Sequence, residues 1–450
     1  MSEQPPTTSV TLRPLALTNR RAVGGPVSLQ LLVAYFAVAL VGWLAATVAA
    51  AFAAGDLAAG RPLAAAPVLA VHLVALGVLP FAVSGASFHL LPVMLRNDLP
   101  SQRALWLALP LLAGGFLVAS GLGREAQPIV WVGAAMVACG LAIVLAEVLK
   151  LVVRAPRGRT LIASRLGVAL ACTHVVAALC LGAVIFDQDR PFGGLSYQRW
   201  LLIHLHLALL GWIALLILTV GRNLAPMLAQ APAAPQRRLP VEELALVAGL
   251  WLLLVGIGTR ERPLTLAGGV VVVLAIGRFA ALMLRVMWSR RGPFEAPLAH
   301  LLLGGFFLAQ ATVCGLAAAA GAGGTRLVSG YVVFLLVGWA GGVVVGHLPK
   351  LLSLSLWVWW PPGPRPKQAQ LYRRRLALLE AALFAAGVEA FALGIIIGPA
   401  PLARVGAILL VGSAVLSAAG VALTLRRPTH RRTIRMTLGT GGGSGQNEAR

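Results

Sequence analysis

The chain has 450 residues, of which 59% are hydrophobic and only 11% are charged, and its mean hydropathy is +0.86. A soluble domain carries about 25% charged residues, so this composition excludes a soluble protein and predicts an integral membrane protein in contact with the lipid bilayer. The formal net charge is +23. Basic residues gather in the cytoplasmic loops of membrane proteins, so this charge is expected to reflect topology, with no nucleic-acid partner.

Twelve apolar segments follow a polar N-terminal segment, residues 1–28. Each is long enough to cross the bilayer, and lipid forces such segments into helices. The sequence therefore predicts an all-α integral membrane protein with a twelve-helix domain over 29–425 and a basic, disordered cytoplasmic tail over 426–450. The expected helices are 29–53, 66–95, 104–122, 129–153, 163–186, 199–228, 241–258, 264–288, 297–320, 329–354, 376–397 and 401–424.

Basic residues alternate between the two sides of this predicted topology. Of the 37 lysines and arginines, 28 fall on the side that holds both termini and eight on the other, while Arg278 lies within the eighth segment. Because positively charged loops resist translocation, both termini are expected to be cytoplasmic. The expected location is the cytoplasmic (inner) membrane of a prokaryote.

An internal repeat links the second and sixth segments. The strings from His72 to Pro92 and from His206 to Pro226 share their histidine, leucine, glycine and proline positions at a constant offset of 134. The tenth segment ends in a similar way at Pro349 but lacks the histidine. The pattern predicts three units of four helices, arranged as three four-helix arcs; the alternative is chance similarity among apolar strings.

Two histidines lie at the same depth on the repeat-related segments. His72 and His206 are each about seven residues into their helices, or about 10 Å below the outer surface. Neutral imidazole is a good iron ligand, so the two can supply opposed ligands to one haem iron. Gly77, Gly85 and Gly211 beside them can leave room for the macrocycle; alternatively, they let helices pack closely.

His204 lies two residues before His206, and residues with this spacing point to opposite faces of a helix. His204 is therefore expected to face a second space, either as a ligand to a second haem or to copper, with His174 as a speculative partner, or as a hydrogen-bonding residue. His174 and His300 are each alone on their helices, and either can be a hydrogen-bonded core residue instead.

The remaining intramembrane polar residues are few. His89 and His347 lie near the cytoplasmic ends of their segments, where they can bond main-chain carbonyls, hold a metal or admit protons. Glu147, Arg278 and Glu389 can each pair inside the bundle or line a polar path.

The four cysteines lie in apolar segments and form neither a CxxC nor a CxxCH motif. This excludes covalent attachment of a c-type haem and a thiolate metal site of recognisable spacing. The expected cofactors are haem b and, as a second possibility, copper. The cysteines themselves are interpreted as small buried apolar residues.

Twelve helices in three arcs resemble subunit I of the haem–copper oxidase superfamily. The second segment, from His72 through Leu79-Pro80-Phe81 to Leu90-Leu91-Pro92, resembles the helix that ligates the low-spin haem in that family. The string His204-Leu205-His206, followed by Ala208-Leu209-Leu210-Gly211-Trp212, resembles the H-x-H helix of the C-type oxidases. The resemblance implies that His72 and His206 bind the low-spin haem and His204 the high-spin haem.

The seventh segment, 241–258, departs from the family because it has no histidine for the copper site. A twelve-helix haem and copper protein of the NnrS type, linked to nitric oxide tolerance, is also similar. The expected function is electron transfer or binding of nitric oxide or oxygen, without oxygen turnover at oxidase rates, beside other respiratory or denitrification subunits. The alternatives are a secondary transporter and a non-catalytic subunit with a vestigial haem site.

Overall fold

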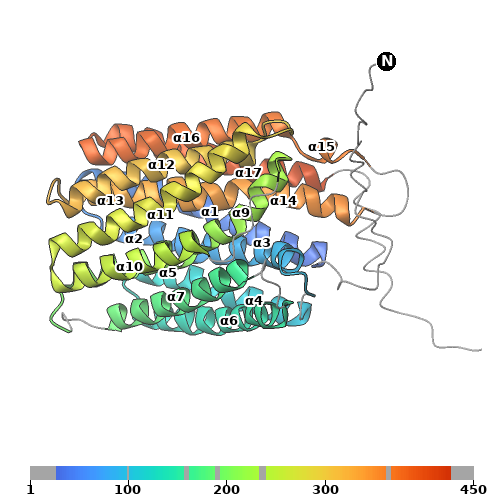
Figure 1. Cartoon of the computed structure of the whole chain (residues 1–450). Helices are drawn as coiled ribbons and strands as arrows, with labels where there is room; N and C mark the ends of the chain where they lie inside the picture. The colour runs from blue at the N-terminus through green and yellow to red at the C-terminus, as the bar shows by residue number, and fades with distance from the viewer. Residues whose placement is uncertain are drawn as a thin grey trace, which may run out of the picture.

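The computed structural model describes residues 27–98, 101–156, 162–187, 193–232, 240–360 and 366–426. Within these ranges the regular structure is entirely helical, and twelve helical spans are long and apolar enough to cross a membrane (Figure 1). The predicted all-α, twelve-helix fold is confirmed. The tail over 427–450, with its histidine His430, and nearly all of the N-terminal segment lie outside the described residues.

Eight of the described spans are single α-helices, and the third span is two helices joined at Ala113. The single helices are α1 (Leu29–Ala58), α6 (Gln127–Arg154), α7 (Ile162–Asp187), α10 (Val241–Thr259), α11 (Arg262–Trp288), α12 (Ala296–Ala319), α16 (Arg374–Ile397) and α17 (Ala400–Leu425). The third span is α4 (Gln102–Leu112) and α5 (Gly114–Leu122), and a short helix, α15 (Gln368–Leu371), lies outside the spans.

Spans 2, 6 and 10 share a construction that the other described spans lack: an α-helix, a π-helical segment and a second α-helix with an internal proline. Their segments are α2 (Ala65–His72), η1 (Leu73–Val78) and α3 (Leu79–Met94); α8 (Tyr197–His206), η3 (Leu207–Ala214) and α9 (Leu215–Ala229); and α13 (Thr325–Val332), η4 (Val333–Gly341) and α14 (Gly342–Val358). A π-helix bonds each amide to the carbonyl five residues earlier, as Leu79 does to Val74. The shared order supports the three-unit repeat.

The spans form three consecutive groups of four that close into a ring. Neighbouring groups meet where α6 packs on α7, where α11 packs on α12 and where α17 returns to α1. On the inside, η4 contacts both η1 and η3, so the three π-helical segments converge at the centre. Spans 10, 6, 1 and 2, in that order, are the most deeply buried. Histidines beside the π-helices are therefore held in the middle of the bundle.

The helix limits differ from the expected ones mainly where a helix continues past a charged residue. The first helix extends beyond residue 53 to Ala58, because alanine favours helix and Asp56 is paired with Arg61. The tenth span begins at Thr325, four residues before the apolar run expected from 329.

The cysteines only partly match their interpretation as buried residues. Cys172 and Cys314 are buried, whereas Cys139 and Cys180 are exposed on the outside of the bundle. Cysteine is apolar enough to face lipid as readily as the core, so its position in an apolar segment does not determine which side it faces.

Helices α16 and α17 pack closely through Gly406, and this contact yields a stability prediction. A Cβ atom at Gly406 would lie 2.1 Å from the Phe391 amide nitrogen, whereas at Gly412 on the same helix the nearest atom, a Leu383 methyl, is 3.7 Å away. Gly406→Ala should destabilise the protein by about 1–3 kcal/mol, because the backbone of α16 must move. Gly412→Ala should not.

The measurement is thermal unfolding in detergent, followed by reaction of buried Cys172 and Cys314 with a thiol dye. Equal melting temperatures for the two variants would contradict the close packing of α16 and α17 at this position.

Candidate functional site

His72 and His206 occupy the same place in the repeat, each as the last residue before a π-helical segment. In the third unit the equivalent residue is Val332, so this position holds a histidine in two of three inner spans. Each π-helix carries an extra residue per turn and is frequent at functional sites. The structure therefore places both predicted haem ligands at one defined feature of the backbone.

His206 is buried and has a partner that the sequence did not reveal. Its Nδ1 lies 2.7 Å from the Leu202 carbonyl and its Nε2 lies 2.9 Å from the Tyr331 hydroxyl of α13. Because a carbonyl only accepts, Nδ1 carries the proton, and the Tyr331 hydroxyl donates to Nε2. The two rings are also stacked, with centroids 5.9 Å apart. This contact joins spans 6 and 10 next to their π-helical segments.

His204 points away from His206, as its spacing predicted. Its Nδ1 lies 2.9 Å from the Ala178 carbonyl of α7, whereas His206 faces α13. The Nδ1 of His72 lies 2.8 Å from the Val68 carbonyl. Each of the three histidines is thus oriented by a main-chain carbonyl, and Tyr331 is the side chain that bonds the Nε2 of His206.

His174 of α7 packs against η3 at Gly211, whereas His206 contacts Tyr331 of α13. A Cβ atom at Gly211 would lie 2.7 Å from that of His174, and the Trp251 ring of α10 is tilted against the imidazole with centroids 6.0 Å apart. Its Nδ1 bonds the Leu170 carbonyl at 2.7 Å, and its buried Nε2 has no hydrogen-bond partner among the described residues. His174 therefore lies beside span 6, with its Nε2 lone pair available.

The glycines next to the histidines serve helix packing in this structure. A Cβ atom at Gly85 would lie 2.7 Å from Phe36 of α1, and one at Gly77 would lie 3.1 Å from Phe116 of α5. With His174 against Gly211, each of the three glycines faces a neighbouring side chain. Of the two interpretations of these glycines, the contacts support close helix packing.

Five histidines share one hydrogen-bond pattern. In each of them Nδ1 bonds a main-chain carbonyl, which leaves Nε2 with its lone pair as the group able to bind a metal or accept a hydrogen bond. The five are His72, His174, His204, His206 and His347. This neutral form is the one that ligates haem iron.

No group of three or more histidine, cysteine or acidic side chains suited to a metal ion occurs among the described residues. Copper beside a haem favours about three imidazoles, and the described residues form no such group. A haem iron takes only one or two protein ligands, so the same finding leaves haem ligation by separate histidines open.

The three other candidate histidines have different surroundings. His89 Nδ1 lies 3.4 Å from Ser355 Oγ, which links spans 2 and 10. His347 is buried and bonds the Val343 carbonyl at 2.6 Å. His300 is only 2% exposed, and its Nε2 lies 2.8 Å from Glu380 Oε2. His300 is therefore held by a carboxylate on α16.

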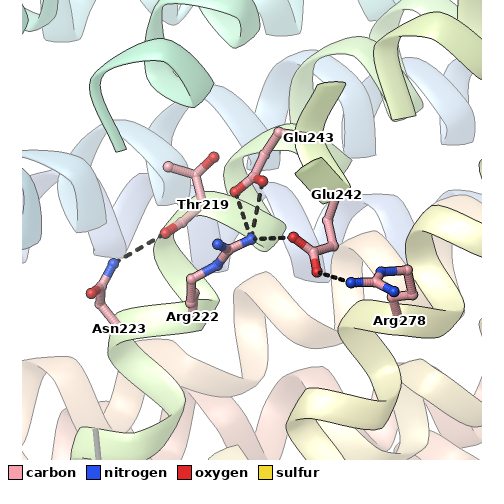
Figure 2. Close-up of polar contacts among 6 residues, drawn as sticks. All are labelled: Thr219, Arg222, Asn223, Glu242, Glu243 and Arg278. Carbon is pink, nitrogen blue, oxygen red and sulfur yellow. Dashed lines mark hydrogen bonds and ion pairs between the residues drawn. The ribbon is translucent and has the colours of Figure 1, made fainter. Parts of the chain in front are cut away.

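The largest ion-pair cluster joins spans 6, 7 and 8, as Figure 2 shows. Arg222 Nη2 lies 3.0 Å and 3.1 Å from the two Glu243 carboxylate oxygens and 3.2 Å from Glu242 Oε2. Glu242 Oε1 in turn lies 3.4 Å from Arg278 Nη2. The cluster balances two acids with two bases, and only Arg278, with 55% of its side chain exposed, reaches far out of the protein.

Several of the basic residues counted on the side of the termini lie inside helices, and two of these form ion pairs with acids of other spans or their ends. Arg222 lies within α9, and Lys350 lies within α14 with its Nζ 2.7 Å from Glu295 Oε2. The acidic partners were not singled out in the sequence, although Glu242-Glu243 at the start of an apolar segment is a signal that could have identified them. Adjacent acids rarely enter a membrane helix unless cations meet them.

The two intramembrane acids named from the sequence, Glu147 and Glu389, also pair inside the protein, as the sequence allowed. Glu147 accepts from Lys150 at 2.7 Å on the same helix, and Glu389 accepts from Gln310 of α12 at 2.9 Å.

A scan against models of known protein families gives no match, and a search of curated proteins finds no significantly similar sequence. The resemblance to haem–copper oxidase subunit I therefore stays a prediction from the helix arrangement and the histidine strings.

The ion-pair cluster predicts a large effect of neutralising Arg222. Arg222→Met leaves Glu243, whose side chain is 2% exposed, as a buried carboxylate without its partner. Breaking a buried pair from one side costs about 3–5 kcal/mol, so the melting temperature in detergent should fall strongly. The control is Arg61→Met, which removes an exposed pair with Asp56 and should cost less than about 1 kcal/mol. A loss for Arg222→Met as small as that of the control would contradict a structural role for the cluster.

Proposed function

We propose that this membrane protein binds haem b between its three inner spans and serves electron transfer or the binding of nitric oxide or oxygen. The observation that carries the proposal is the equivalent position of His72 and His206, each directly before a π-helical segment at the centre of the bundle. In two of the three units a histidine stands at the same predicted depth, directly before a π-helical segment. This favours a shared ligand-binding role for the two histidines over two unrelated core residues.

The residues fit this cofactor in their donor chemistry. His72 and His206 both have Nδ1 bonded to a carbonyl, which fixes the imidazole orientation and leaves Nε2 to face a ligand. Buried apolar residues follow both histidines, Leu73 and Val74 after His72 and Leu210 after His206, and apolar surroundings suit the faces of a porphyrin.

The protein's own groups would orient the site and set its polarity. A bound haem iron supplies one-electron redox chemistry and, at an open position, binding of a diatomic gas. Val68 and Leu202 hold the two imidazoles through their carbonyls. Tyr331 donates to His206 Nε2 in this structure and must release that nitrogen for it to act as an iron ligand.

His204 is the alternative second ligand, because the Nε2 of His206 already has the Tyr331 hydroxyl as its partner. If His206 keeps Tyr331 as its partner, His72 and His204 would share the iron. An electron-transfer role also implies a redox partner, and a subunit of a respiratory or denitrification chain is the class that we propose.

The spectrum of the purified protein tests the proposal. We expect a Soret band with redox-sensitive visible bands, and loss of the low-spin bis-histidine spectrum in both His72→Ala and His206→Ala. His204→Ala should retain it, because its ring faces α7. A folded protein without any haem bands would overturn the proposal and favour the transporter or structural alternatives.

Tyr331→Phe is the matched control for the His206 assignment. It removes the hydroxyl that competes for Nε2 and keeps the ring, so haem should bind at least as tightly as in the unaltered protein. Loss of the spectrum in His204→Ala, together with its retention in His206→Ala, would transfer the second ligand to His204.

We also propose that both termini lie in the cytoplasm, from the distribution of basic residues. Single cysteines replacing Gly24 and Gly443, in a background without the four native cysteines, should react with an impermeant maleimide only after the cells are opened. Gly324→Cys between α12 and α13 should react in intact cells, because a side chain there meets no atom within 4 Å. Labelling of the terminal positions in intact cells would reverse the orientation.

A further inference from the structure

A pocket lies between α12, α14, α16 and α17, near the end of the bundle that holds α15. Its polar lining comes from Tyr372, Arg373, Glu380, Ser417 and Thr424. Arg373 is exposed, whereas Glu380 is 5% exposed and seven residues further along the chain, or about 10 Å deeper along α16. The pocket therefore leads from the surface of the protein toward a buried carboxyl group.

Glu380 is held by two side chains from two other spans. Its Oε2 lies 2.8 Å from His300 Nε2 of α12, and its Oε1 accepts from Ser413 Oγ of α17 at 2.7 Å. The His300 ring is itself fixed, because Gly346 leaves it space on one side and Phe384 lies 5.1 Å from its centroid on the other. These contacts hold the carboxyl group at the inner end of the pocket in a single orientation.

The cations around the pocket are engaged with other groups. Lys350 of α14 pairs with Glu295 at 2.7 Å and lies over the Tyr372 ring, and Arg374 donates to the Phe294 carbonyl at 2.8 Å. Arg373 is at the exposed mouth, and His347 on α14 is near His300. Within the described part of the chain, His300 is thus the partner of Glu380 that can supply a charge.

An ionised Glu380 beside a neutral His300 would place a net negative charge in a site of low polarity, which is costly. One added proton removes that charge. On His300 this proton would sit at Nδ1, which is buried and has no hydrogen-bond partner among the described residues, so it would leave an N–H without an acceptor. On Glu380 it can bind Oε1, where the Ser413 hydroxyl changes from donor to acceptor, while His300 Nε2–H continues to donate to Oε2. One O–H bond forms, no other covalent bond changes, and the proton comes from water.

We propose that Glu380 is a proton-binding carboxyl group that exchanges its proton with water through this pocket, at the end of the bundle that holds α15. The site is separate from the histidines proposed to bind haem, and the inference holds whether or not haem binds. A carboxyl group that takes up and releases a proton inside the bilayer couples that event to the packing of spans 9, 11 and 12.

Two hydroxyl groups in the pocket are suited to holding the water for this exchange. Neither the Tyr372 hydroxyl nor Ser417 Oγ forms a hydrogen bond of normal geometry with a described residue, although both are buried. Burial raises the pKa of Tyr372, so its hydroxyl stays protonated and can both donate and accept. Together they provide polar contacts between the mouth and Glu380.

Gly420 on α17 offers a way to close the pocket without touching Glu380. A Cβ atom at this lining position would meet only a Leu376 methyl, at 3.7 Å, so Gly420→Leu begins its side chain without a clash at a residue that lines the pocket. Gly412 on the same helix has an equivalent surrounding, a Leu383 methyl at 3.7 Å, but does not line the pocket. The pair Gly420→Leu and Gly412→Leu is therefore matched.

Infrared difference spectroscopy of the full-length protein in lipid tests the proposal. The C=O stretch of a protonated carboxylic acid should grow as the pH is lowered, and this band should be lost in Glu380→Gln but kept in Glu389→Gln. Glutamine at 380 preserves the size of the side chain and can still bond Ser413 and His300, which favours folding. Glu389 provides the control because it lies on the same helix, paired with Gln310.

The route is tested by transfer into D2O. The band should shift as the acid proton exchanges for deuterium, and Gly420→Leu should slow this exchange severalfold while Gly412→Leu leaves it unchanged. A band that does not change with pH, or that survives in Glu380→Gln, would overturn the assignment of the proton to Glu380. Equal exchange rates in the two leucine variants would overturn the pocket as its route.

Discussion

Lipid offers no hydrogen bonds to a peptide group or a polar side chain, and this constraint determines most of what the structure contains. Helices satisfy the main chain within each span. The polar side chains must find partners in other spans, as Arg222 does with Glu243, Glu380 with His300 and Glu389 with Gln310. Each such contact fixes two helices relative to one another, so the few polar residues determine the packing of many apolar ones.

The spans could be predicted because apolar length and basic loops are properties of the sequence alone. The π-helical segments could not, since Leu73–Val78 has the same apolar composition as the helices around it. The side-chain partners from different spans could not be predicted either. Arg222 and Glu243 lie in two different apolar segments, and a hydropathy profile does not show which segments are in contact. Arg222 also resembles a loop residue in the sequence, whereas α9 continues past it. Hydropathy is one-dimensional, whereas pairing depends on which helix faces which.

For the histidines, too, some features could be predicted from the sequence and others could not. Helix geometry predicted that His204 and His206 face opposite ways, because that follows from the rotation per residue. The contact between His206 and Tyr331 was not predictable, since it depends on the packing of span 6 against span 10. The two interpretations of the glycines could not be separated from the sequence, because a missing side chain serves a cofactor and a neighbouring helix equally well.

Polar groups recur at one level of the inner spans, beside the prolines within their second α-helices. Each inner span carries a polar residue two or three positions before its proline: His89 before Pro92, Asn223 before Pro226 and His347 before Pro349. Asn223 and His347 bond main-chain carbonyls, at 3.3 Å and 2.6 Å, and His89 meets Ser355 of another span. The repeat therefore provides one irregular backbone three times, and each arc adds different side chains to it: an arginine and two glutamates in the second, and a histidine, a glutamate and a serine in the third.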